Sequence, residues 1–334
     1  MAKKPREPLE TSKHGGWFTG EPRGYESVVL IHGILGDQIG TWGDFPHLLE
    51  IDNDLPKLDI LLWGYETGAF FGFRYLSIEQ EANRLMSGLE AQLTHGEPFV
   101  FVAHSMGGLI ALQGITENIL GEAEDHPPVE DLALVTLYAT PLGGSFWANL
   151  LYPVLFWLPR LTVARQVGAL TTIGFVSRLA KRCKNLIDCV DVPQRTKGRR
   201  MTVRSVQGLH DSIVGSRSAV GTFAHAPRAH ALANGHGTIK LPRHHRDDRY
   251  RVLKVDLARK LRQRLYDLAV EASGEAGLRG ARARQRIARQ YSRQLEVCAL
   301  VASGGKNPSD IQRKEAMTLF INVAASEVWT PEVC

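Results

Sequence analysis

Short apolar runs alternate with amphipathic segments through the first half of the chain. Four runs rich in β-branched and aromatic residues predict buried strands, at residues 27–31, 58–65, 99–102 and 132–138. Between the second and third runs, apolar residues recur at helical spacing from Ile78 to Leu93, after a capping box that begins at Ser77. This alternation is typical of a parallel sheet with helices on both faces.

The second half of the chain interrupts this pattern and then resumes it. Residues 146–161, FWANLLYPVLFWLPRL, are strongly apolar, but Pro153 and Pro159 and the short length argue against a membrane span. We interpret the segment as a cap over a ligand pocket, with a buried core segment as the alternative. A further strand is predicted at 201–206, and helices are predicted at 255–272 and 279–302.

Residues 99–112, FVFVAHSMGGLIAL, place a serine between a strand and a helix. Ala103, Ser105 and Gly107 have the spacing of the G-x-S-x-G nucleophile elbow, with alanine in place of the first glycine. In such an elbow one residue is strained, and its side chain projects clear of the sheet because small neighbours let the strand and helix approach. Ser105 holds that position, at a helix N-terminus that favours negative charge. The alternative is an ordinary polar turn, but strand and helix flank the serine in the required order.

A glycine-rich loop, HGILG at residues 32–36, follows the first predicted strand. It lacks the G-x-x-x-x-G-K-[ST] and G-x-G-x-x-G patterns of phosphate-binding loops. The HG-x-x-G pattern suits an oxyanion loop, because Gly33 lets the backbone turn so that the next N–H group points at a substrate oxygen.

A carboxylate and a histidine follow the strand predicted at 201–206. Asp211 comes just past the end of that strand, which places it on the same edge of the sheet as the elbow. His236 follows in a loop between two glycines, which favours it over other histidines nearby. The rival histidines and carboxylates are His210, His225, His230, Asp188 and Asp191. The last two precede the strand rather than follow it, so Asp211 is preferred.

The elbow, the HG-x-x-G loop and the candidate residues after them make this sequence resemble the α/β-hydrolase superfamily. In that superfamily the serine, the acid and the histidine occur in this order along the chain. The resemblance covers roughly residues 25–265. Within it, IHGILGD, AHSMGG, ATPLGGS and GHGTIKLP are similar to the lipase and serine-esterase branch, including inositol-deacylase-like and mitochondrial serine-esterase-like proteins. The helices from about residue 273 onward fall outside the resemblance.

The resemblance implies a role for each landmark. Ser105 would be the nucleophile, His236 the general base and later acid, and Asp211 the group that orients the imidazole. The N–H groups of Met106 and Ile34 would form the oxyanion hole. The reaction would be ester hydrolysis through an acyl-serine intermediate, with no metal or cofactor. His104 and His32 are interpreted as structural residues.

We therefore expect an α/β-hydrolase fold: a mostly parallel, doubly wound sheet with a helical cap insertion and extra C-terminal helices. The expected parts are a flexible arm at 1–24, a core at 25–145 and 196–272, a cap at 146–195 and a C-terminal helical extension at 273–334.

Composition narrows the class of protein. An apolar content of 44% and a charged content of 22% are typical of a soluble globular protein. The net charge is +5, and arginines cluster after residue 195 and again between residues 279 and 293. A basic surface made by these arginines is most often simply solvated, and the alternative is that it favours contact with anionic membrane. No specific nucleic acid partner is expected. The four cysteines form no C-x-x-C pair and are typical of reduced thiols.

The predicted function follows from these observations. We expect a serine esterase that acts on lipid or acyl esters, located in the cytoplasm, with peripheral contact with anionic membrane as an option. The basic N-terminus has no apolar run after it, so no signal peptide is predicted. The alternatives are a non-catalytic α/β-hydrolase scaffold, a membrane-docking interaction protein or effector, and an enzyme that transfers acyl groups to alcohols.

Overall fold

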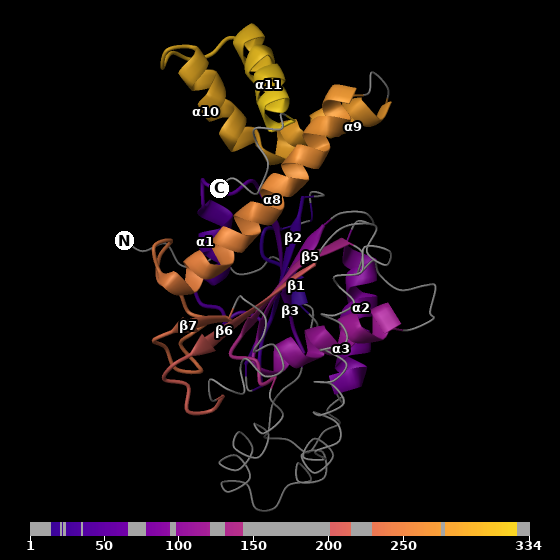
Figure 1. Ribbon diagram of the computed structural model, residues 1–334, viewed down its shortest axis with the longest axis vertical. Helices are drawn as coiled ribbons and strands as arrows, with labels where there is room; N and C mark the ends of the chain where they lie inside the picture. The colour runs from indigo at the N-terminus through magenta and orange to yellow at the C-terminus, as the bar shows by residue number, and fades with distance from the viewer. Residues whose placement is uncertain are drawn as a thin grey trace, which may run out of the picture. The chain divides into compact units, whose positions relative to one another are not determined.

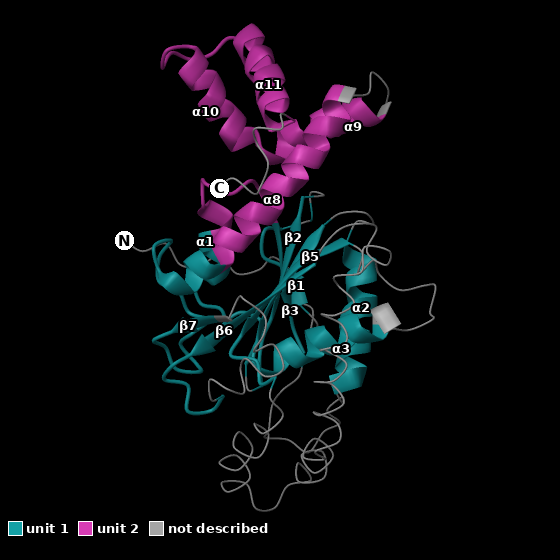
Figure 2. Cartoon of the chain, viewed as in Figure 1, with its two compact units in different colours: residues 1–48, 59–252 teal, residues 49–58, 253–334 magenta. Residues whose placement is uncertain are grey.

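The computed structural model describes ten segments of the chain. They are residues 15–20, 22, 25–34, 36–65, 78–93, 98–120, 131–142, 201–214, 229–274 and 278–325. The predicted cap at 146–195 lies outside them. The chain divides into two compact units, one of residues 1–48 and 59–252, and one of residues 49–58 and 253–334 (Figure 2).

One sheet organises the first unit (Figure 1). Among the described residues it has seven strands in the spatial order β1-β3-β2-β4-β5-β6-β7. The strands are β1 Gly15–Trp17, β2 Ser27–Ile31, β3 Asp59–Trp63, β4 Phe99–His104, β5 Leu132–Tyr138, β6 Thr202–Gly208 and β7 Ala229–Leu232. All neighbouring pairs are parallel except β1 and β3. The carboxyl ends of β4, β6 and β7 therefore meet at one edge, where ligands bind in open α/β sheets.

The edge strand β1 lies within the segment that the sequence predicts as a flexible arm. Trp17 pairs with Leu61 and packs against the core, which gives this short strand its anchor. Gly15 has φ 120°, and a Cβ atom there would collide with the carbonyl of Leu62. A three-residue strand with two glycines has no alternating pattern, so hydrophobic periodicity does not reveal it.

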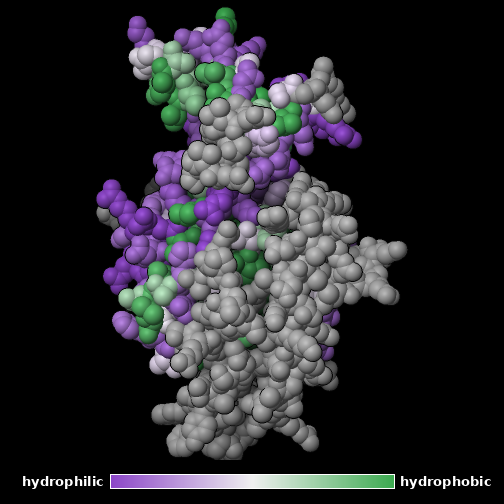
Figure 3. Space-filling view, viewed as in Figure 1, coloured by the Kyte–Doolittle hydropathy of each residue, from purple (hydrophilic) through white to green (hydrophobic). Residues whose placement is uncertain are grey.

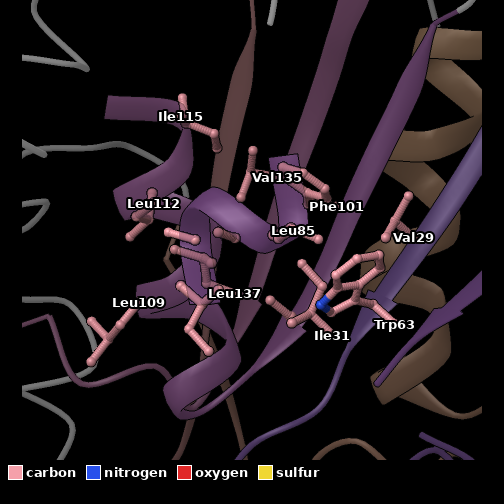
Figure 4. Close-up of a cluster of buried hydrophobic side chains, with 14 of the residues drawn as sticks. Val29, Ile31, Trp63, Leu85, Phe101, Leu109, Leu112, Ile115, Val135 and Leu137 are labelled. Atoms are coloured by element: carbon pink, nitrogen blue, oxygen red, sulfur yellow. The ribbon is translucent and has the colours of Figure 1, made fainter. Parts of the chain in front are cut away.

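The two faces of the sheet are covered by different groups of side chains. On one face, odd-numbered strand residues such as Phe101 and Val135 pack with Leu85 of α2 (Ile78–Gln92) and Leu109 of α3 (Met106–Leu120) (Figure 4). Because strand side chains alternate, the even-numbered residues face the other way. There the ring of Phe45, which begins α1 (Phe45–Ile51), meets that of Tyr138 edge-on at a centroid distance of 6.0 Å. Both faces of β4 are therefore buried, up to the residue that precedes the elbow.

Helices make up most of the second unit. They are the greater part of α8 (Asp248–Gly274), α9 (Leu278–Gln290), α10 (Ser292–Ala302) and α11 (Asp310–Ala324). Their core includes Leu268, Ile287 and Tyr291. No helix in the described part of the chain is both long enough and apolar enough to span a bilayer.

The helix predicted at 279–302 is two helices, α9 and α10, that meet at Tyr291. The carbonyl of Gln290 accepts a hydrogen bond of 3.0 Å from the N–H of Lys57. Tyr291 has φ −98° and ψ 21°, and its hydroxyl donates to the carbonyl of Leu261 at 3.0 Å. These tertiary contacts favour a break that helical periodicity alone does not indicate.

Candidate active site

Ser105 stands at the turn between β4 and α3 in a strained backbone conformation. Its φ of 53° lies in the left-handed region, which is uncommon for a residue other than glycine. The N–H of Ser105 donates to the carbonyl of Tyr138 at 2.9 Å, and its own carbonyl accepts from the N–H of Gly108 at 3.1 Å. The strain is held by hydrogen bonds on both sides of the residue, as a nucleophile elbow requires.

Two glycines let the elbow and the oxyanion loop approach each other. A Cβ atom on Gly107 would collide with the carbonyl of His32 and lie 2.6 Å from the carbonyl oxygen of Ile31. A Cβ atom on Gly33 would lie 2.9 Å from the Cβ of Ser105. No larger side chain fits at either position unless neighbouring atoms move. The two loops can pack this closely because both positions are glycine.

The structure brings Ser105, Asp211 and His236 together from three different loops. The Nε2 atom of His236 lies 3.1 Å from Oγ of Ser105, and its Nδ1 atom lies 2.9 Å from Oδ2 of Asp211. The serine follows β4, the aspartate follows β6 and the histidine follows β7. A histidine that accepts from the serine hydroxyl must carry its proton on Nδ1, where it donates to the carboxylate.

The carboxylate of Asp211 is fully buried and oriented by its own loop. Its Oδ1 atom accepts hydrogen bonds from the N–H groups of Ile213 at 2.9 Å and Val214 at 2.7 Å. These bonds leave Oδ2 to face His236. The buried charge is therefore satisfied by three donors, a condition for keeping a carboxylate inside a protein.

The rival residues are placed differently. His210 and His230 are exposed, and His230 lies within β7, where it pairs with Val206. His225, Asp188 and Asp191 lie outside the described residues.

The two expected oxyanion donors belong to the elbow and to the loop after β2. Met106 is the first residue of α3, so its N–H has no carbonyl partner within the helix. Neither this N–H nor that of Ile34 has a hydrogen-bond partner among the described residues. Both groups are thus available to a substrate oxygen.

His32 fixes the shape of the oxyanion loop. Its Nδ1 donates to the carbonyl of Gly33 at 2.9 Å, and its Nε2 accepts from the N–H of Tyr65 at 3.2 Å. The hydroxyl of Tyr65 donates to the carbonyl of His32 at 2.6 Å, and the two rings stack with centroids 4.2 Å apart. Burial lowers the pKa of His32, which suits a neutral ring with one donor and one acceptor nitrogen.

Among the described residues, no group of three His, Cys, Asp or Glu side chains is arranged to hold a metal ion. The chemistry that this geometry can support is nucleophilic attack by an activated serine next to two N–H donors.

No family model and no curated protein sequence matches the chain. Solved structures do resemble it. A membrane phospholipase A, described as a bacterial virulence factor, is 12% identical with a TM-score of 0.43 and matches over 72% of this chain and 81% of its own. The type II thioesterase BorB of the borrelidin cluster is 15% identical with a TM-score of 0.42, over 75% and 98%. The esterase Pf2001 of Pyrococcus furiosus is 14% identical with a TM-score of 0.40, over 68% and 80%.

The strand order of the chain itself identifies the fold. An antiparallel edge strand precedes a parallel sheet in the order β3-β2-β4-β5-β6-β7, with the elbow after β4 at its centre. With this order and this elbow, the protein has the α/β-hydrolase fold.

Proposed function

We propose that this protein is a serine hydrolase that cleaves carboxylic esters through an acyl-Ser105 intermediate. The observation that carries the proposal is the continuous hydrogen-bonded path from Oγ of Ser105 through His236 to Asp211, at 3.1 and 2.9 Å. A non-catalytic scaffold would have no need of a strained serine, a correctly placed imidazole and a buried carboxylate in one line.

Acylation would begin when Oγ of Ser105 attacks the ester carbonyl carbon while Nε2 of His236 takes the hydroxyl proton. The electron pair of the broken C=O π bond moves onto the oxygen, and the N–H groups of Met106 and Ile34 stabilise that charge. Asp211 accepts the hydrogen bond from the Nδ1–H group of His236 throughout and stabilises the imidazolium. The tetrahedral intermediate then collapses, and the leaving alcohol takes the proton from Nε2.

Deacylation would repeat these steps with water as the nucleophile. His236 takes a proton from water, the hydroxide attacks the acyl carbon, and the second tetrahedral intermediate expels Oγ of Ser105, which recovers its proton. One ester and one water give one alcohol and one acid. An alcohol in place of water would give acyl transfer by the same route.

Acyl or lipid esters are the substrate class that we propose. The support comes from the sequence of residues 146–161, whose dense apolar and aromatic content would be costly to expose to water, at about 25 cal/mol per Å². A pocket lined by side chains of this composition would bind hydrocarbon. Each methylene of the acyl chain that it buries should add up to about 0.8 kcal/mol to transition-state binding.

We also propose contact with anionic membrane, supported by the second unit. Three of the exposed arginines on α9, Arg279, Arg282 and Arg289, form what we call the α9 arginine row, and α9 has no acidic residue. Near an anionic bilayer, each arginine contributes about 1 kcal/mol. Hydrophobic residues also reach the surface along α10 and α11 (Figure 3), and Val297 and Val301 are 61% and 75% exposed. The combination of basic and apolar exposed residues favours a membrane over nucleic acid.

Hydrolysis of p-nitrophenyl esters of increasing chain length tests the enzymatic proposal. The wild type should turn over, with kcat/KM rising with chain length, and Ser105→Ala should not. Ser273→Ala is the matched control, because among the described residues that exposed hydroxyl bonds only to a carbonyl of its own helix. A folded wild type that hydrolyses none of the esters would overturn the proposal in favour of a scaffold. A flat series would overturn the preference for acyl chains alone.

Co-sedimentation with phosphatidylcholine vesicles, with and without phosphatidylserine, tests the membrane proposal. Binding should require phosphatidylserine, fall as salt rises and weaken when all three arginines of the α9 arginine row become glutamine. The control removes the same charge from three exposed positions on other helices, Arg251, Arg262 and Lys314. Equal loss in both triple variants would mean that only net charge matters.

A further inference from the structure

His104, the residue before the serine, contacts the loop that carries His236. It is the last residue of β4 and is buried, with 5% of its surface exposed. Its Nε2 atom lies 3.0 Å from the backbone carbonyl oxygen of His236, and the two rings approach with centroids 4.8 Å apart. A carbonyl oxygen can only accept, so Nε2 of His104 carries the proton and donates it.

The other ring nitrogen of His104 faces the oxyanion loop. A Cβ atom on Gly33 would lie 2.8 Å from Nδ1, so the loop packs directly against the ring. Among the described residues, this buried Nδ1 has no hydrogen-bond partner. His104 therefore lies where the elbow, the oxyanion loop and the loop that carries His236 (residues 233–240, the histidine loop) meet. The one hydrogen bond that its ring makes to a described residue goes to the histidine loop.

The surroundings of His104 keep its ring neutral. Burial lowers its pKa well below 6.5, and the positive charges of Lys240 and His236 act in the same direction. His32 adds a smaller effect of the same sign, while the bond to the carbonyl of His236 opposes them. A neutral ring keeps a single N–H donor, and that donor is the one aimed at His236.

Other hydrogen bonds hold the rest of the histidine loop, among them one of 3.1 Å from the N–H of His210 to the carbonyl of Asn234. Lys240 donates from Nζ to the carbonyl of Gly237 at 2.9 Å, and the Oγ1 of Thr238 accepts from the N–H of Gly235 at 3.2 Å. These contacts shape the loop but do not reach the elbow. The bond from His104 joins the loop to the residue beside the nucleophile, across 132 positions of sequence.

We propose that His104 is a positioning residue: its Nε2–H group holds the carbonyl of His236 and thereby sets the distance from Nε2 of His236 to Oγ of Ser105. This inference rests on the proposed serine-hydrolase function. A catalytic base that is displaced by about 1 Å loses on the order of 10²-fold in rate. The ring of His104 bonds to a backbone carbonyl and not to the reacting atoms, so its effect should appear in kcat and not in substrate binding.

Three substitutions at His104 separate the hydrogen bond from the volume of the ring. Glutamine can present an amide N–H at nearly the reach of Nε2, asparagine presents it about one bond shorter, and leucine fills the space without a donor. The assay is hydrolysis of a p-nitrophenyl ester by the full chain, with the melting temperature measured for each variant. The leucine variant should lose about 10- to 100-fold in kcat with KM changed less than about twofold. Glutamine should recover most of this loss, and asparagine should recover little.

A purely structural role for His104 would give a different pattern. Glutamine, asparagine and leucine would then lower the melting temperature in step with activity, or leave kcat intact, and either result would overturn the proposal. If the leucine variant does not fold, the comparison of glutamine with asparagine decides, and equal kcat values overturn the proposal. A wild type that neither hydrolyses esters nor reacts with a fluorophosphonate contradicts the proposed function itself. An active wild type with an equally active leucine variant contradicts only the role of His104.

Discussion

Replacement of Asp211 by asparagine separates the catalytic contribution of this residue from its structural one. The carboxylate accepts on Oδ1 from the N–H groups of Ile213 and Val214, and on Oδ2 from Nδ1 of His236. Asparagine keeps an oxygen for the two backbone donors and places an NH₂ group opposite Nδ1. That group can only donate, so it stabilises the imidazole tautomer whose proton is on Nε2. Such a ring cannot take the proton of Ser105.

The expected loss of activity follows from this wrong tautomer. By analogy with other serine-histidine-aspartate sites, kcat should fall by about 10⁴-fold, which corresponds to about 5.4 kcal/mol at 1.36 kcal/mol per factor of ten. Stability should barely change, because both backbone hydrogen bonds remain. Asp211→Ala removes them as well and leaves the buried N–H of Val214 unpaired, which costs about 1–3 kcal/mol.

Two measurements check this prediction: kcat for a p-nitrophenyl ester and urea unfolding followed by circular dichroism. Asp267→Asn, which changes a carboxylate on α8 that is hydrogen-bonded to Gln263, is the control and should behave as wild type in both. If Asp211→Asn kept more than about a tenth of wild-type kcat, the proposed role of the carboxylate would be refuted. An alanine variant as stable as the asparagine variant would refute the role assigned to Oδ1.

Two further predictions concern stability. Gly107→Ala would place a Cβ atom 2.6 Å from a backbone oxygen of Ile31, so the free energy of unfolding should fall by about 1–3 kcal/mol. Gly237→Ala, which has open space around it, is the control and should change that free energy by less than about 0.5 kcal/mol. Equal effects of the two variants in urea unfolding would contradict the elbow packing. Burial lowers the pKa of His32 and His104 in the folded protein, so the unfolded chain binds more protons below pH 6.5, and stability should fall as pH drops from 7 to 5. His104→Gln should make that fall shallower, and an unchanged slope would contradict the buried neutral ring.

Much of the fold could be predicted because its strands are long apolar runs. The observed β5, Leu132–Tyr138, coincides with the prediction, and β2 and β4 agree closely. The misses have physical causes. The strand β7, Ala229–Leu232, is four residues long and contains no β-branched residue, so its place depends on pairing with β6. The break between α9 and α10 depends on tertiary hydrogen bonds that no local pattern carries.

Only part of the candidate site could likewise be predicted from the sequence. The elbow motif indicates Ser105, the position just past a predicted strand indicates Asp211, and the loop between two glycines favours His236. The structure brings these three side chains together, although the strand that precedes His236, β7, was not predicted. The contact of His104 with the backbone of His236 could not be predicted. Its partner is a carbonyl group that every residue has, and sequence spacing does not indicate which one lies nearby. The elbow motif marks His104 only as a variable position.

Covalent labelling with a fluorophosphonate, followed by peptide mapping by mass spectrometry, tests the central claim most directly. Activated serines react with this probe, so the wild type should gain one label, and the labelled peptide should contain Ser105. Ser105→Ala should gain none, and His236→Gln should react far more slowly, since its serine has lost the general base. A label on any other serine, a label that persists in Ser105→Ala, or a folded wild type that stays unlabelled would contradict the account.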